Sequence, residues 1–260
     1  MTQIERAQLF ASLHAKGAPL ILFNIWDPGS ARTVAEAGAK AIATGSWSVA
    51  AALACNDGED VPLDSVLANA RRIVGAVDLP VTIDFEGGYG QTPADVAANA
   101  RQLIETGAVG CNFEDQIVGD DALYSIEEQC ARIEAIRRAA DDTRIPFFIN
   151  ARTDLFLQAE RAKHADYLEE ALRRADAYAT AGASGFFAPG LKQPEQIEKL
   201  CARSPLPVNI MITADTPSHH DLAGFGVARI SYGPGPYRQA AASLKLAAQQ
   251  AFAAGSARAM

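Results

Sequence analysis

Two carboxylates follow a short apolar run, and they could hold a metal ion. The run Val81-Thr82-Ile83 leads into Asp84 and Glu86, and the glycine-rich turn Gly87-Gly88-Tyr89-Gly90 follows. Val and Ile favour a strand, and the glycines permit a tight turn or a close approach to a ligand. On an extended strand Asp84 and Glu86 project to the same side, where two like charges need a cation or a shared proton. We expect a divalent metal here; the alternative is a strand-end Asp84 that caps the next helix.

Further oxygen ligands follow neighbouring strand-like runs. Glu114 ends the apolar run 109–114, and Asp57 lies in the sequence Asn56-Asp57-Gly58. Carboxylates without a nearby histidine suit Mg²⁺ better than Zn²⁺. The pattern therefore predicts that Asp57, Asp84, Glu86 and Glu114 face one Mg²⁺ site, with Mn²⁺ as an alternative ion. Asp57 could equally be only a turn residue, because Asn-Asp-Gly is a strong turn sequence.

Groups that could bind an anionic substrate accompany these acids. Arg152 ends the apolar run Phe147-Phe148-Ile149, and its partner is either a substrate carboxylate or one of the acids above. The segment Ser46-Trp47-Ser48 offers backbone N–H groups and hydroxyls for a carboxylate or a developing oxyanion. Trp47 could instead be a packing residue. The four histidines lie in or beside helical patterns, and we interpret them as surface residues.

The elements that position these groups alternate regularly along the chain. Strand-like runs occur at residues 20–26, 41–47, 81–86, 109–114, 146–152, 185–188, 207–212 and 227–232. Helical patterns occur at 30–37, 64–77, 92–107, 125–136, 164–181, 194–202, 218–223 and 236–254, with a capping box at Ser125 and Glu128. Eight strands alternating with eight helices predict an α/β fold, a closed (β/α)₈ TIM barrel formed by one domain of residues 1–260. In such a barrel the reactive groups collect at the C-terminal ends of the strands, which is where they occur here.

Composition narrows the partners. The 260 residues carry a net charge of -8, which disfavours nucleic acid and anionic membrane surfaces as partners. No run is long and apolar enough for a membrane span, and the N-terminal residues do not resemble a secretory signal. The four cysteines form no C-x-x-C pair, as is usual for free thiols in a reducing compartment. We therefore expect a cytoplasmic protein.

Six ordered motifs run along the chain. They are Asn24-Ile25-Trp26-Asp27-Pro28-Gly29-Ser30-Ala31-Arg32, residues 44–52, Asn56-Asp57-Gly58-Glu59, Asp84-Phe85-Glu86-Gly87-Gly88-Tyr89-Gly90, Asn112-Phe113-Glu114-Asp115-Gln116 and Asn150-Ala151-Arg152-Thr153-Asp154. Together they resemble the isocitrate lyase/phosphoenolpyruvate mutase superfamily. The resemblance covers the chain from about residue 20 to the last strand. It implies a (β/α)₈ barrel, Mg²⁺ and small carboxylate or 2-oxo acid substrates. It also implies a homo-oligomer, a dimer or a tetramer, in which the last helix is exchanged between subunits.

Carried over by motif, the resemblance assigns roles to individual residues. Asp84 would bind Mg²⁺ directly, and Asp57, Glu86 and Glu114 would reach it through waters. Arg152 and the backbone of Ser46, Trp47 and Ser48 would hold the substrate. Many members carry Asp where Glu86 stands. The lyases also carry Lys-x-Cys-Gly-His after the Glu-Asp-Gln motif, whereas residues 117–124 here contain none of Lys, Cys or His, so Tyr124 or a bound water would have to supply a proton.

These features together predict a Mg²⁺-dependent lyase. We expect it to break a C–C bond of a small 2-oxo acid or substituted dicarboxylate, by decarboxylation or a retro-aldol or Claisen-like cleavage, through a metal-stabilised enolate, with Arg152, Glu114 and Tyr124 as the catalytic groups. The first alternative is a P–C bond enzyme, a phosphonopyruvate hydrolase or phosphoenolpyruvate mutase. The second is a barrel that binds dicarboxylates without catalysis.

Overall fold

The computed structural model describes residues 1–120 and 122–256 and contains a barrel of eight parallel strands. The strands are β1 (Leu20–Leu22), β2 (Ile42–Ala43), β3 (Val81–Asp84), β4 (Gly110–Glu114), β5 (Phe148–Arg152), β6 (Gly185–Phe187), β7 (Val208–Met211) and β8 (Arg229–Ser231). From β2 to β8 each strand pairs in parallel with the next one in sequence, and β1 pairs with β8. A parallel bridge between Ile25 and Thr44 joins the chain after β1 to the chain after β2 and closes the barrel. The predicted (β/α)₈ fold is confirmed.

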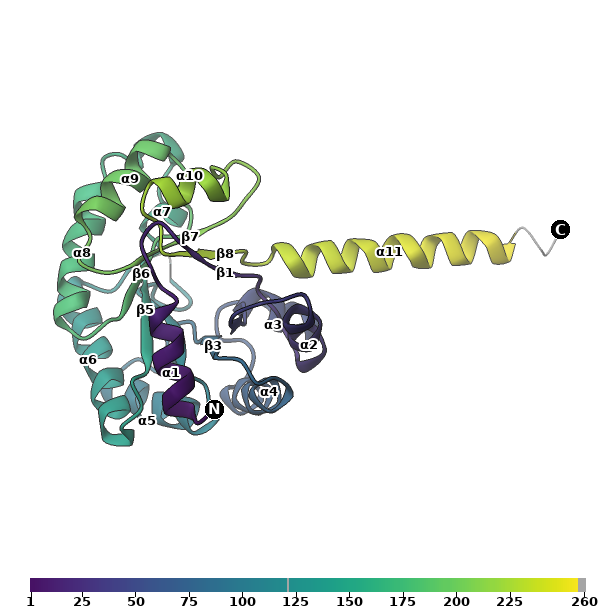
Figure 1. Ribbon diagram of the computed structural model, residues 1–260, viewed down its shortest axis with the longest axis horizontal. Coiled ribbons are helices and arrows are strands. Elements are labelled where there is room, and N and C mark those ends of the chain that lie inside the picture. The colour runs from purple at the N-terminus through teal and green to yellow at the C-terminus, as the bar shows by residue number, and fades with distance from the viewer. Residues whose placement is uncertain (121, 257–260) are drawn as a thin grey trace.

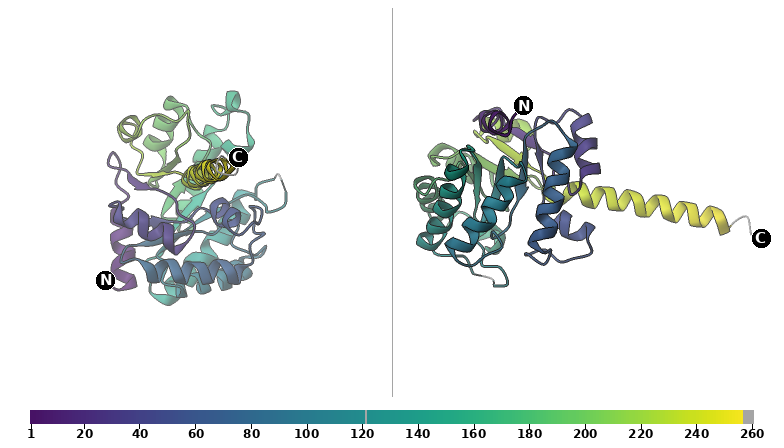
Figure 2. Two further views of the ribbon diagram at one scale, coloured as in Figure 1. Left: turned by 90° about the vertical axis from the view of Figure 1, so that its right-hand side faces the viewer. Right: turned by 90° about the horizontal axis from the view of Figure 1, so that it is seen from below.

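Helices surround the strands (Figures 1 and 2). They are α1 (Gln3–Ser12), α2 (Pro28–Glu36), α3 (Ser46–Ala52), α4 (Leu63–Ala76), α5 (Pro93–Glu105), α6 (Ile126–Thr143), α7 (Leu155–Gln158), α8 (Leu168–Thr180), α9 (Pro194–Arg203), α10 (His219–Gly224) and α11 (Gly235–Ser256), with a 3₁₀ turn at Arg161–Lys163. The capping box predicted at Ser125 and Glu128 is present at the start of α6. Three helices were not expected from the sequence: α1, α3 and α7.

The N-terminal end of the barrel is closed by α1. Phe10 is fully buried and meets the ring of Phe148 edge-on at 5.4 Å, while the ring of His14 stacks on Phe148 at 4.1 Å. The interpretation of all four histidines as surface residues is therefore wrong: His14 is half-buried, and His164 is buried against Phe156. Helical patterns alone could not reveal this, because His14 is covered by Phe148 of the distant strand β5, and His164 is covered by Phe156 of the unpredicted helix α7.

The last helix leaves the barrel. Figure 1 shows α11, in yellow, extending away from the other elements. Its first turn stays in contact with the barrel rim, where Tyr237 packs edge-on against Trp26 and Trp47, and the guanidinium of Arg238 lies over the ring of Trp47 at 4.5 Å. None of the helices in the described part of the chain is both long and apolar enough to cross a membrane.

Candidate active site

Asp84 lies at the end of β3, and each of its two carboxylate oxygens accepts one hydrogen bond. The backbone N–H of Ser46 donates to Oδ2 at 3.0 Å, and Nδ2 of Asn112 is 3.4 Å from Oδ1. The Asp84 N–H is held in turn by Thr44 Oγ1 at 2.8 Å. The donors to the carboxylate are neutral groups and occupy one lone pair on each oxygen. The remaining lone pairs are available to a cation.

Ser46-Trp47-Ser48 forms the first turn of α3 rather than an isolated turn. Gly45 is the N-cap residue, so the amides of this segment lie at a helix start, where backbone N–H groups lack partners within the helix. Ser46 and Trp47 line a cavity beside Asp84, whereas Ser48 is fully buried and is not among the lining residues. Of the four residues predicted to bind substrate, Ser46, Trp47 and Arg152 line this cavity, and Ser48 does not.

Asp57 lies beside Asp84, as predicted, on the loop that follows α3. It lines the same cavity as Asp84 and Ser46. Desolvation and the nearby Asp84 carboxylate raise the pKa of Asp57, while a hydrogen bond from Ser46 opposes this shift. A carboxyl group whose pKa is raised in this way by a neighbouring carboxylate favours a cation between the two.

Glu86 points toward the loop of residues 56–60. Oε2 accepts hydrogen bonds from the backbone N–H groups of Gly58 at 2.9 Å and Glu59 at 2.7 Å, and Oε1 accepts one from the hydroxyl of Tyr89 at 2.9 Å. Burial raises the pKa of Glu86 to about 7, and the bonds from the loop amides oppose the shift. Its water-mediated metal contact stays a prediction.

Arg152 and Glu114 form a buried ion pair. Arg152 Nη1 lies 2.8 Å from Glu114 Oε2, while Nε and Nη2 bond the two carboxylate oxygens of Asp154 at 2.6 and 2.7 Å. Burial disfavours the charged guanidinium, but the Glu114 and Asp154 carboxylates outweigh it and raise the pKa of Arg152. Nε and Nη2 each donate one N–H to Asp154 and Nη1 faces Glu114, so at least two of the five guanidinium N–H groups remain for a substrate anion.

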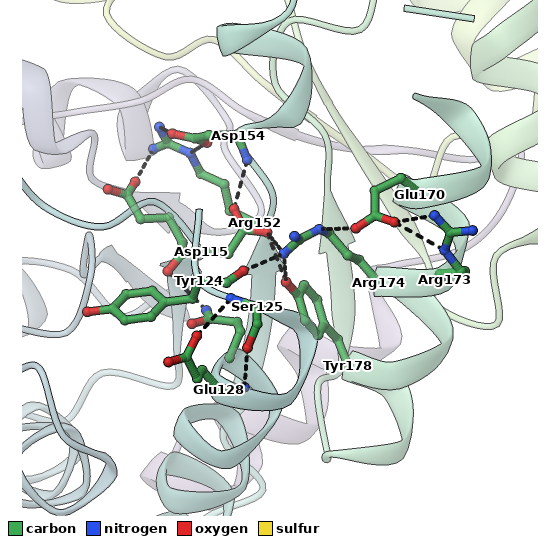
Figure 3. A network of polar contacts seen from close by, with 12 residues as sticks. Asp115, Tyr124, Ser125, Glu128, Arg152, Asp154, Glu170, Arg173, Arg174 and Tyr178 are labelled. Carbon is green, nitrogen blue, oxygen red and sulfur yellow. Dashed lines mark hydrogen bonds and ion pairs between the residues drawn. The ribbon is translucent and has the colours of Figure 1, made fainter. Parts of the chain in front are cut away.

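A network of polar side chains holds in place the residues that follow β4 and β5 (Figure 3). Asp115 is fully buried; Oδ2 accepts bonds from Arg174 at 3.0 Å and Tyr178 at 2.9 Å, and Oδ1 accepts the N–H of Asp154 at 3.0 Å. Asp154 in turn holds Arg152. Since a buried charge persists only when it is paired, the network stabilises a single orientation of the Arg152 guanidinium.

Two cavities meet at this group of residues. The first, of about 160 Å³, has mixed walls: Asn24, Gly45, Ser46, Trp47, Asp57, Asp84, Asn112, Arg152, Leu157, Phe187, Pro189, Met211, Ser231, Gly233 and Pro234. The second, of about 520 Å³, is polar and lies under the loop after β4: Ser46, Asp57, Gly58, Glu86, Glu114, Gln116, Val118, Gly119, Asp120 and Arg152. Ser46, Asp57 and Arg152 line both cavities. A small anionic ligand at their junction would meet a carboxylate-rich wall and one guanidinium.

Comparisons with known proteins agree with this arrangement. The family model described as Phosphoenolpyruvate phosphomutase matches residues 10–252. The chain belongs to the isocitrate lyase/phosphoenolpyruvate mutase superfamily. This superfamily of Mg²⁺-dependent enzymes includes lyases, hydrolases and mutases.

Individual superfamily members differ in activity. A Burkholderia cenocepacia J2315 protein that carries the provisional name phosphonomutase is 50% identical, with a TM-score of 0.94 over 96% of this chain and 99% of that one. The 2-methylisocitrate lyase of Salmonella typhimurium is 31% identical over 79% of this chain and 70% of its own length. The oxaloacetate decarboxylase of Pseudomonas entomophila is 29% identical over 88% of this chain and 78% of its own length.

The site suits the Mg²⁺ of the superfamily in its donor chemistry. Its charged ligands are carboxylate oxygens, and Asp84 keeps free lone pairs beside a polar cavity with room for water. No three Asp, Glu, His or Cys side chains within residues 1–120 and 122–256 lie close enough together to hold an ion between them.

The structure does not bring Tyr124 to the cavities. Its ring packs on the guanidinium of Arg132 at 4.0 Å, and in Figure 3 it points away from Arg152. The Tyr124 backbone joins the network instead, since its N–H donates to the Asp115 carbonyl at 2.8 Å and its carbonyl accepts from Arg174 at 3.1 Å. Its catalytic role stays a prediction that this arrangement does not support. Asp121, in the same loop, lies outside the described residues.

Sequence reasoning missed two buried polar residues inside the barrel. Asn112 Oδ1 accepts bonds from Asn150 at 2.9 Å and Arg229 at 3.0 Å, so its Nδ2 must face Asp84. Arg229 is 1% exposed, and burial lowers its pKa to about 9. Both were visible as signals: Asn112 lies two residues before Glu114 on one strand face, and Arg229 interrupts the apolar run of β8.

Proposed function

We propose that this protein is a Mg²⁺-dependent lyase that cleaves a C–C bond in a small 2-oxo acid or substituted dicarboxylate. The observation that supports this most directly is that Asp84 and Arg152 line one cavity of about 160 Å³. One group is suited to a cation and the other to a substrate carboxylate, so a 2-oxo acid could span the two. The bond broken would be the one whose electrons can move toward the 2-oxo group.

The cavity favours a carboxylate over a phosphonate. Arg152 is the only Lys, Arg or His among the residues that line it in the described part of the chain, and it is already paired with Glu114 and Asp154. A phosphonate carries up to two negative charges where a carboxylate carries one, and the described lining offers no second cationic side chain for the extra charge. The apolar wall of Trp47, Leu157, Phe187, Pro189, Met211 and Pro234 instead suits an alkyl substituent. A P–C bond enzyme remains the alternative.

Different residues of the chain would bind the metal, orient the substrate and exclude water. Mg²⁺ held by Asp84, with Asp57, Glu86 and Glu114 at water-mediated distance, would supply Lewis-acid stabilisation of negative charge. The two free N–H groups of Arg152 would orient the substrate carboxylate, and the loop after β4, which lines the polar cavity, would exclude water.

Cleavage of isocitrate or 2-methylisocitrate is not expected. Residues 116–125 contain no Lys, Cys or His, so the acid of the lyase loop is missing, and losing a general acid typically costs about 10² to 10⁴ in rate. Cys130 is the nearest thiol in sequence, but it lies within α6, where burial and then Glu134 and Glu127 raise its pKa. Release of glyoxylate or pyruvate from either substrate, undiminished by Cys130→Ser, would show that another acid has replaced the motif.

Assembly through α11 forms part of the proposal. Leu244, Leu246 and Phe252 are 73%, 56% and 75% exposed, and an apolar groove of about 560 Å³ runs along β1 and α2 beside Ile21 and Phe23. We expect α11 of a second copy to cover such a groove. Light scattering should show a dimer or tetramer at micromolar concentration, and the double variant Leu244→Glu, Leu246→Glu should reduce the mass. A monomeric wild-type protein would contradict this.

A substrate panel tests the activity. Oxaloacetate, alkylated malates, 2-methylisocitrate and phosphonopyruvate would each be incubated with the protein and Mg²⁺, and with a chelator as the control. We expect Mg²⁺-dependent release of a C–C cleavage product from oxaloacetate or an alkylated malate. Phosphate release from phosphonopyruvate would favour the P–C alternative. Tight binding without turnover of any compound would favour a dicarboxylate-binding barrel.

A further inference from the structure

We infer that Glu86 is a positioning residue that fastens the loop of residues 56–60 and thereby presents Asp57 to the site. Its role as a metal-site carboxylate would then be secondary. The inference rests on the proposed function only for the role of Asp57 in the active site. The fastening itself is a property of the fold.

The contacts of the Glu86 carboxylate are with the loop. Its two oxygens take three hydrogen bonds, of which the amides of Gly58 and Glu59 supply two and Tyr89 the third. The side chain is 6% exposed, and no Lys, Arg or His in the described chain forms an ion pair with it. A buried carboxylate without a cation needs its hydrogen bonds. The two bonds from Gly58 and Glu59 exist only while the loop stays in place.

The fastening is reciprocal. Glu59, on the loop, accepts the backbone N–H of Tyr89 at its Oε1, at 2.7 Å. Each segment thus contributes one glutamate that accepts backbone amides of the other. The two segments also pack closely, since a Cβ placed on Gly87 would come within 3.1 Å of Glu59 Oε1. Asp57 lies immediately before the two fastened amides, so its position follows from theirs.

The backbone at this contact is strained. Glu59, Glu86 and Tyr89 have φ values of 61°, 48° and 56°, in the left-handed region that residues other than glycine rarely adopt. Such conformations persist where surrounding contacts impose them. At Glu86 the conformation follows directly after β3 and directs the side chain to the loop, while Asp84 faces the cavity.

Side-chain length distinguishes fastening from metal binding. Glu86→Gln keeps the length and a carbonyl oxygen that can accept both amides, but removes the charge. Glu86→Asp keeps the charge but is one methylene shorter, so it cannot reach the loop amides and Tyr89 together. The two roles therefore predict opposite orders of effect for the two variants.

Hydrogen exchange read by mass spectrometry or NMR tests the fastening without substrate. We expect the amides of Gly58 and Glu59 to exchange at least tenfold faster in Glu86→Asp than in wild type, and to change less than about threefold in Glu86→Gln. The amides of β5 serve as an internal control for global unfolding. Equal exchange in Glu86→Asp and wild type would overturn the inference.

Activity supplies a second readout once a substrate is known. Fastening predicts a larger fall in Mg²⁺-dependent kcat/KM for Glu86→Asp than for Glu86→Gln, and a smaller effect of Glu86→Asp in an Asp57→Asn background than in wild type. Full effects in both backgrounds, with Glu86→Gln the more damaging change, would assign Glu86 to the metal site instead. Unchanged exchange would reject the fastening whether or not the proposed function holds.

Discussion

The two ends of the barrel are built differently. At the C-terminal end, Asp84, Glu114 and Arg152 line the two cavities, and strained residues such as Glu86 hold the loops. At the N-terminal end, α1 closes the strands with the rings of Phe10, His14 and Phe148. Buried charge and backbone strain cost stability, whereas buried aromatic surface supplies it. The candidate site therefore lies at the end of the barrel where buried charge and strain lower the stability of the fold. Aromatic packing at the N-terminal end offsets this loss.

Arg152→Lys tests the C-terminal end and should have the largest effect of the three substitutions that compare the two ends. Lysine keeps the charge opposite Glu114 and Asp154 but cannot make the bidentate contact that orients a carboxylate. We expect kcat/KM to fall by about 10² to 10³, the usual loss for one oriented donor at a reacting group. Thermal unfolding should change less than in the next variant. A large loss of stability with normal activity would reverse the contrast between the two ends.

Phe10→Ala tests the N-terminal end. The ring is fully buried between α1 and the barrel, so its removal leaves a cavity and should destabilise the fold by about 3 kcal/mol. Denaturant unfolding measures this loss. The folded variant should keep its Mg²⁺ affinity, because α1 does not line either cavity. A change in metal affinity comparable to that in stability would show that the two ends are coupled.

His14→Phe should have the smallest effect, and one that depends on pH. Burial lowers the pKa of His14 from 6.5 to about 3, with Arg229 adding to the shift, so the folded protein keeps the ring neutral while the unfolded chain protonates it. Stability is thus lost as the pH falls from about 6.5 toward 3. Between pH 6.5 and 5 the His14 contribution amounts to about 1 to 2 kcal/mol. Relative to wild type, His14→Phe should lose that much less over this interval; parallel pH profiles would contradict the assignment.

The sequence predicted the barrel because each strand and most helices carry their own local signals. Alternating apolar runs, Pro93 at a helix start and the Ser125 capping box depend only on neighbouring residues. It failed for α1 because the burial of Phe10 depends on Phe148, more than a hundred residues away. The short helices α3 and α7 were not predicted, because too few residues carry their helical pattern.

The sequence predicted which residues form the candidate site better than it predicted the contacts between them. Asp57, Asp84 and Arg152 do meet at one cavity, because the ends of barrel strands converge. The sequence could not show that Glu86 turns to the loop of residues 56–60, since that depends on a left-handed backbone at a non-glycine residue. It also left the partner of Arg152 open between a substrate carboxylate and one of the predicted metal-site acids. The geometry shows the ion pair and leaves two N–H groups for the substrate.

The central claim is that the C-terminal end is a metal site centred on Asp84. The direct test is a Mn²⁺ or Mg²⁺ titration of wild type and Asp84→Asn by calorimetry or electron paramagnetic resonance, with thermal unfolding of both metal-free proteins. We predict that Asp84→Asn loses metal affinity and, since Lewis-acid stabilisation is worth several kcal/mol, about 10³-fold or more of any Mg²⁺-dependent activity. Its metal-free stability should be equal to or above that of wild type, because one of several neighbouring carboxylates is neutralised. Wild-type metal affinity in Asp84→Asn would contradict the account.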